Sequence, residues 1–152
     1  MKKILDLGCG NRKYKGAVGV DINHKSDANI IHDLNKFPYP FSDKSYDIVY
    51  SSNTIEHLEN PLQFLKECKR IAREKVVIIT DNQTSLHYIF GNRYKNDPHL
   101  FAWNDHSLFR LMKKAGLKNI KIEIDGGYKS TIGNIICIFK IFKPSIIGKG
   151  NV

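Results

Sequence analysis

Cysteine and histidine motifs for disulfides or metal ions are missing from this chain of 152 residues. The three cysteines (Cys9, Cys68 and Cys137) are an odd, widely spaced set without a C-x-x-C pair. The six histidines form no H-E-x-x-H pattern and no repeated short spacing. The sequence therefore predicts reduced thiols and no metal site.

Long hydrophobic segments are missing as well. The longest apolar run, residues 135–139, is far shorter than the ~18 residues that a membrane-spanning helix needs. Only two consecutive apolar residues, Ile4 and Leu5, directly precede Asp6, whereas a secretory signal has an apolar core of roughly 7–15 residues. Together with reduced cysteines, these absences predict a cytoplasmic protein without a membrane span.

Acidic residues are scarce beside basic ones, at 15 against 24, which gives a net charge of +9. Residues 1–81 carry 13 basic and 11 acidic residues, whereas residues 82–152 carry 11 and 4. A concentrated positive charge leaves a nucleic-acid partner open. Nineteen of the 24 basic residues are lysine, however, and arginine binds phosphate more specifically. A genome rich in A/T codons explains the charge equally well.

What the sequence does contain is an alternation of short β-rich runs with helical segments. The expected strands are residues 3–7, 17–22, 29–33, 46–50, 75–80, 120–124 and 134–142. The expected helices are residues 60–73 and 105–115, where apolar side chains recur at helical spacing. This alternation predicts a single α/β domain over residues 1–152 with a mostly parallel sheet.

A glycine-rich turn follows the first expected strand. Residues 6–10 read D-L-G-C-G, and the second expected strand ends in Asp21 and Ile22. Glycine lets the backbone approach a ligand closely at the carboxyl edge of a parallel sheet, and an acid after the next strand can accept both hydrogen bonds of a ribose diol. A pyrophosphate site needs a third glycine where this chain has Lys13. The pattern favours a nucleoside cofactor without a pyrophosphate.

Further motifs follow in a fixed order. They are H-D-L at residues 32–34, F-P-Y-P-F at 37–41, S-Y-D-I-V at 45–49 and I-E-H-L-E-N-P at 55–61. With the glycine-rich turn and G-V-D-I at residues 19–22, this series resembles class I S-adenosylmethionine-dependent methyltransferases, in particular small ones with D-L-G-C-G and E-H-L-x-x-P motifs. The resemblance covers about residues 3–81. It implies a Rossmann-like, seven-stranded sheet, mostly parallel with one antiparallel strand.

The resemblance also implies a cofactor site for S-adenosylmethionine at successive strand ends. Its residues would be Asp6, Gly8, Cys9, Gly10, Asp21, Ile22, Asp33, Leu34, Ser51 and Asn53. Asp21 would hold the ribose hydroxyls, and Asp33 would accept a hydrogen bond from the adenine amino group. His57 would lie near the acceptor entrance, where a general base acts if the acceptor must lose a proton.

The sequence departs from the family pattern in its first two crossovers. Residues 9–16 and 23–28 are too few for a crossover with a helix, which takes about 10–12 residues. We therefore expect loops there, and part of the sheet left uncovered beside them. A second copy of the chain, a partner subunit or the tail with Ile146 and Ile147 would cover it. The third glycine of the family is replaced by Arg12.

No motif in the sequence identifies the molecule that accepts the methyl group. A small metabolite or sugar is the first expectation, with RNA or protein as further alternatives. A cofactor-binding but inactive module, or a subunit that stabilises a partner enzyme, is the alternative from another class. The aromatic and histidine residues between His87 and Trp103 either face the substrate or pack against the sheet.

Overall fold

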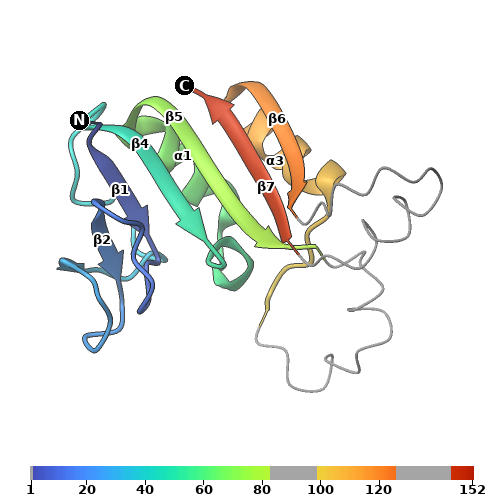
Figure 1. Ribbon diagram of the computed structural model, residues 1–152. Helices are drawn as coiled ribbons and strands as arrows, with labels where there is room; N and C mark the ends of the chain where they lie inside the picture. The colour runs from blue at the N-terminus through green and yellow to red at the C-terminus, as the bar shows by residue number, and fades with distance from the viewer. Residues whose placement is uncertain (1, 83–98, 126–144) are drawn as a thin grey trace, which may run out of the picture.

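A seven-stranded sheet forms the centre of the protein. The computed structural model describes residues 2–82, 99–125 and 145–152. The strands are β1 (Ile4–Leu7), β2 (Val18–Asp21), β3 (Ile30–Ile31), β4 (Tyr46–Ser52), β5 (Ala72–Asp81), β6 (Lys118–Asp125) and β7 (Ser145–Asn151). Their order is β3-β2-β1-β4-β5-β7-β6, and β7 runs antiparallel to both of its neighbours (Figure 1). The expected sheet, mostly parallel with one antiparallel strand, is confirmed.

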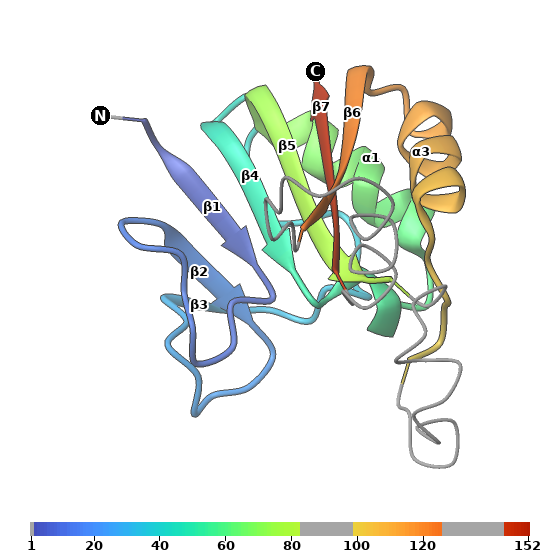
Figure 2. The same cartoon turned by 45° about the vertical axis from the view of Figure 1, so that its right-hand side comes forward.

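Two α-helices pack on the same face of this sheet (Figures 1 and 2). Helix α1 (Pro61–Ile71) begins where the Asn60 side chain accepts a hydrogen bond from the backbone N–H of Gln63. Helix α3 (Asp105–Lys114) begins with reciprocal hydrogen bonds between Asn104 and Ser107. Neither of these helices, nor the short 3-10 helix η1 (Ile55–His57), is long and apolar enough to cross a membrane.

The first two crossovers are loops, as expected from their length. In the first, the backbone N–H of Tyr14 donates to Asp6 Oδ2 over 2.7 Å, and the Tyr14 ring lies 4.8 Å from the Tyr50 ring of β4. In the second, Asn29 Oδ1 accepts hydrogen bonds from the Gly19 N–H and from Lys13 Nζ. In each case a side-chain oxygen thus accepts a hydrogen bond from a backbone N–H group.

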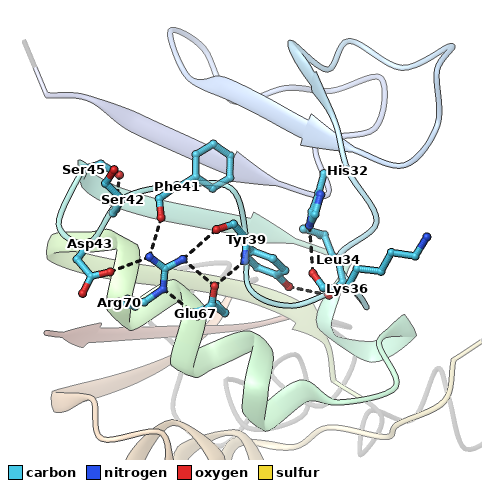
Figure 3. Close-up of polar contacts among 10 residues, drawn as sticks. All are labelled: His32, Leu34, Lys36, Tyr39, Phe41, Ser42, Asp43, Ser45, Glu67 and Arg70. Carbon is cyan, nitrogen blue, oxygen red and sulfur yellow. Dashed lines mark hydrogen bonds and ion pairs between the residues drawn. The ribbon is translucent and has the colours of Figure 1, made fainter.

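The third crossover, residues 32–45, is held against α1 by hydrogen bonds to an ion pair of that helix (Figure 3). Arg70 donates to both carboxylate oxygens of Glu67, over 2.9 and 2.8 Å. The same guanidinium donates to the carbonyl oxygens of Tyr39 and Phe41, and Glu67 accepts from the Tyr39 N–H. Two side chains of α1 therefore fix the path of the chain between β3 and β4.

The last strand differs from its sequence prediction. The expected strand 134–142 lies outside the described residues, and β7 is formed by residues 145–151. Ile146 is buried in β7, between β5 and β6. The expectation that a tail with Ile146 and Ile147 covers the first strands is wrong, because these residues are at the other end of the sheet.

Glycines in β7 explain how this strand fits under α3. A Cβ at Gly148 would lie 2.6 Å from Met112 Sδ, and a Cβ at Gly150 would lie 3.1 Å from Leu117 Cβ. Glycine inside a strand marks such a close approach. Side chains of ordinary size at these two positions would push the helix away from the sheet.

Candidate active site

A cleft of about 380 Å³ opens at the carboxyl ends of β1, β2 and β4. It is lined by Gly8, Gly10, Asp21, Ile22, His32, Asp33, Leu34, Asn35, Asn53, Thr54, His57 and Leu58. Eight of these residues are expected site residues from the sequence. Parallel α/β sheets bind ligands at this edge, because the loops that follow neighbouring strands converge there.

The floor of the cleft is the turn that contains Gly8 and Gly10. Gly8 has a φ of +75°, and a Cβ there would lie 2.6 Å from Thr54 Cγ2 and still closer to Thr54 Oγ1. Gly10 has a φ of +50° and no atom within 4 Å of an ideal Cβ. Gly8 therefore lets the turn pack against Thr54, while Gly10 leaves open space above the turn.

Asp21 lies beside this turn with its carboxylate already oriented. Its Oδ2 accepts from the Gly10 N–H and its Oδ1 from the Asn23 N–H, both over 2.8 Å. Each carboxylate oxygen has a second acceptor position, so the pair can still receive two hydroxyl groups. The neighbouring Ile22 is 61% exposed and offers an apolar surface to a flat ring.

Asp33 and Leu34 form the far wall of the cleft. Asp33 Oδ1 accepts from the Asn35 N–H over 3.0 Å, and the Leu34 carbonyl accepts from the buried Tyr39 hydroxyl over 2.7 Å. Burial raises the pKa of that hydroxyl, which keeps it a donor. The Tyr39 backbone is in turn held by Glu67 and Arg70, so this wall depends on α1.

A second hollow of about 510 Å³ lies on the other side of the glycine turn. It is lined by Asp6, Gly8, Cys9, Gly10, Asn11, Arg12, Tyr50, Ser52 and Asn53. Burial raises the pKa of Asp6, and it raises the pKa of the Cys9 thiol to about 11. Cys9 is therefore protonated at neutral pH, and it is a small neutral lining residue rather than a nucleophile.

One expected site residue lines neither hollow. Ser51 is 1% exposed, and its hydroxyl donates to the Leu7 carbonyl over 2.7 Å. It joins β4 to β1 beneath the cleft. Of the expected aromatic cluster, residues 87–98 lie outside the described residues, whereas Phe101 and Trp103 stack with ring centres 5.7 Å apart.

At the edge of the cleft, His57 lies close to Glu56 and to His99, which belongs to the expected aromatic and histidine cluster. Glu56, His57 and His99 each offer a ligand atom, and these atoms lie within 4.8 Å of one another. The two imidazole rings have centres 4.6 Å apart at an angle of 64°. Glu56 follows buried Ile55 in the sequence, whereas His99 comes from a distant segment, so spacing alone could not connect them.

Backbone hydrogen bonds bring His99 to this place. The N–H groups of Leu100 and Phe101 both donate to the Glu56 carbonyl, over 2.8 and 3.2 Å. The Glu56 side chain is 1% exposed, and its Oε2 accepts from the Thr80 hydroxyl over 3.0 Å. Burial raises the pKa of Glu56.

Comparison with known proteins identifies the family of this chain. The sheet carries a glycine turn after β1, an acid at the end of β2 and an acid after β3. Residues 5–80 match the family described as a methyltransferase domain, so the chain belongs to that family. The expected membership of a methyltransferase family is thereby confirmed.

Three similar proteins illustrate the relationship. An uncharacterized protein of Methanocaldococcus jannaschii is 28% identical over 96% of this chain and 65% of its own length. A probable S-adenosylmethionine-dependent methyltransferase of Mycolicibacterium smegmatis is 24% identical over 77% of this chain and 52% of its own length. The chain thus spans less than two thirds of these curated relatives. A crystal structure of a SAM-dependent methyltransferase from Archaeoglobus fulgidus shares the fold, with a TM-score of 0.75 and 22% identity over 99% of this chain and 86% of that one.

Proposed function

We propose that this chain transfers a methyl group from S-adenosylmethionine to a small-molecule acceptor. The observation that supports the proposal is the cleft, in which the Gly8 turn, Asp21 and Asp33 meet at the ends of successive strands. When bound, the cofactor supplies an electrophilic methyl group on a sulfonium whose leaving group is neutral. The protein then has to orient the two reactants, which contributes roughly 7–11 kcal/mol in well-aligned systems.

The residues of the cleft would hold this cofactor at several points. Asp21 retains two acceptor positions that would receive the ribose hydroxyls, and exposed Ile22 would pack against the adenine ring. Asp33 would accept a hydrogen bond from the adenine amino group. On the other side of the turn, Arg12 lines the second hollow, and its guanidinium suits the carboxylate of the methionine part. Arg12 thus offers a positive charge at the position of the missing third glycine.

A small acceptor is favoured over nucleic acid because none of the described residues that line the cleft is a lysine or arginine. The two carboxylates of the cleft, Asp21 and Asp33, are assigned to the cofactor. A site that receives a phosphate backbone needs positive charge beside the reacting group. Elsewhere, Arg70 and Arg73 are paired with carboxylates. His57 is exposed and lines the cleft, and we assign it to the acceptor end.

Calorimetry with S-adenosylmethionine tests the cofactor part of the proposal. We expect the unmodified protein to bind the cofactor with one-to-one stoichiometry. Asp21→Ala removes a charged acceptor whose hydrogen bonds are worth roughly 1.5–3 kcal/mol each, so binding should weaken about tenfold or more. Formation of S-adenosylhomocysteine with a pool of small hydroxyl and amine compounds then tests transfer.

Asp27→Ala is the matched control for this experiment. Asp27 is exposed in the same crossover as Asn23 and does not line the cleft, so its removal should leave the affinity unchanged. An unmodified protein that does not bind the cofactor at millimolar concentration would contradict the proposed function.

A further inference from the structure

We propose that Glu56, His57 and His99 bind a divalent transition-metal ion at the acceptor end of the cleft, and that this ion binds and acidifies a hydroxyl group of the acceptor. The metal site stands on the geometry alone. The acceptor step rests on the proposed function. This site replaces the sequence expectation that the chain has no metal site.

The first observation is the ligand set. One carboxylate oxygen and two imidazole nitrogens lie within 4.8 Å of one another. Ligand atoms around a tetrahedral ion at about 2.0–2.2 Å lie about 3.3–3.6 Å apart, so side-chain rotations of the exposed His57 and the partly buried His99 suffice to close the site. Two imidazoles and a carboxylate favour zinc, cobalt, iron or manganese over magnesium and calcium.

The second observation is an unpaired buried oxygen. Glu56 Oε1 is buried, and among the described residues no hydrogen-bond donor reaches it. An unpaired buried carboxylate oxygen is costly unless a cation compensates it. Oε2 accepts from the Thr80 hydroxyl, which orients the carboxylate as outer partners of metal ligands commonly do.

The third observation is how rigidly the three residues are held. Glu56 and His57 belong to η1 directly after the Thr54 that packs on Gly8. The two hydrogen bonds from Leu100 and Phe101 to the Glu56 carbonyl bind the segment of His99 to η1. The site therefore joins two segments that are distant in the sequence, and the segment of His57 lines the cleft.

The position of His57 connects the ion to the acceptor. His57 is exposed and lines the cleft, so an ion with three protein ligands would keep open positions toward it. An acceptor hydroxyl that fills such a position has a lowered pKa. Its proton leaves to water, the electron pair stays on the oxygen, and no oxidant or reductant is consumed.

Calorimetry with Zn²⁺ and the visible absorption of bound Co²⁺ test the metal site. We expect one ion per chain, with Ca²⁺ binding at least about a hundredfold more weakly. His99→Ala and Glu56→Gln should each weaken Zn²⁺ binding by about tenfold or more; the second variant keeps the acceptor for Thr80. His24→Ala, which removes an exposed histidine far from the cluster in sequence, is the control. Equal Zn²⁺ binding by all four proteins would overturn the metal site.

The hydroxyl step is tested with 4-nitrocatechol, whose absorption reports ionisation of its hydroxyl groups. We expect the Co²⁺-loaded protein to shift this absorption, and the shift to be lost in His99→Ala. A bound ion without any shift would overturn the acceptor step. Calorimetry with S-adenosylmethionine on the same preparations separates the two proposals: failure to bind the cofactor contradicts the proposed function, whereas Zn²⁺ binding reports on the metal site independently.

Discussion

At the scale of single residues, Gly8 is where the structure leaves least room for change. Its φ of +75° is unfavourable for any residue with a Cβ, and Thr54 occupies the space into which that Cβ would project. We expect Gly8→Ala to lower the free energy of unfolding by about 2–4 kcal/mol, from left-handed strain and overpacking together. It should also abolish detectable cofactor binding. Urea unfolding and calorimetry measure the two effects.

Gly16 offers a control with the same backbone strain. Its φ is +78°, and no atom lies within 4 Å of an ideal Cβ there. Gly16→Ala should therefore cost only about 1–2 kcal/mol and leave the cofactor affinity intact. Equal losses of stability in both variants would show that contact with Thr54 contributes nothing.

The sequence could predict site residues that follow strands, and it could not predict those brought together by tertiary contacts. Asp21 and Asp33 follow β-rich runs, so parallel pairing alone places both at one edge. Ser51 follows the same rule but points to the Leu7 carbonyl, because successive side chains of a strand alternate between two faces. His99 reaches Glu56 through backbone hydrogen bonds that no spacing rule reports.

At the scale of elements, α1 supports the cleft through the Glu67–Arg70 pair. Hydrogen bonds from Arg70, together with the Tyr39 N–H, lower the pKa of Glu67. A lowered carboxyl pKa stabilises the fold above the unfolded value of about 4.3 and loses this effect as the pH falls through the folded value. Glu67→Gln should therefore lose about 1–3 kcal/mol at pH 7. Below the folded pKa of Glu67, the difference from the unmodified protein should shrink.

Unfolding in urea at several pH values between about 7 and 3 measures this difference. Glu74→Gln is the control, because Glu74 pairs with Lys2 through side chains that are about half exposed. Such surface pairs contribute roughly 0–1 kcal/mol. A pH-independent difference for Glu67→Gln would show that packing, rather than charge, explains the loss.

Elements with a clear hydrophobic pattern could be predicted, and the first six expected strands overlap β1 to β6. Both expected helices, residues 60–73 and 105–115, agree with α1 and α3 to within about two residues, because one apolar face and a polar cap define each of them. The strand β7 had no such signal. Its sequence S-I-I-G-K-G-N has glycine at the two positions where Met112 and Leu117 leave no room for a side chain.

At the scale of the whole molecule, the two halves of the sheet are supported differently. Among the described residues, helices pack against β4, β5, β6 and β7, whereas loops connect β1, β2 and β3. Tyr14 and Ile31 are 45% and 42% exposed at the loop-connected end. That a second copy or a partner subunit covers this end stays a prediction, which light scattering over a range of concentrations checks.

Hydrogen exchange should report this asymmetry. Without cofactor, we expect the amides of residues 8–17 and 22–29 to exchange faster than those of α1 and β5, because their hydrogen bonds belong to turns and side chains rather than to regular structure. S-adenosylmethionine should slow exchange in both loops and leave α1 and β5 unchanged. The Asp21→Ala variant, at the same cofactor concentration, should show no slowing. Slowing confined to α3 would contradict the location of the cleft.

The place of β7 between β5 and β6 has a consequence for synthesis on the ribosome. The two strands that flank β7 are complete by residue 125, but neither pairs with the other. Until residues 145–151 have been translated, both present unpaired backbone edges, which are templates for association with other chains. The nascent protein therefore passes through a stage in which the edges of β5 and β6 need protection, by a chaperone or by rapid translation of the segment that closes the sheet.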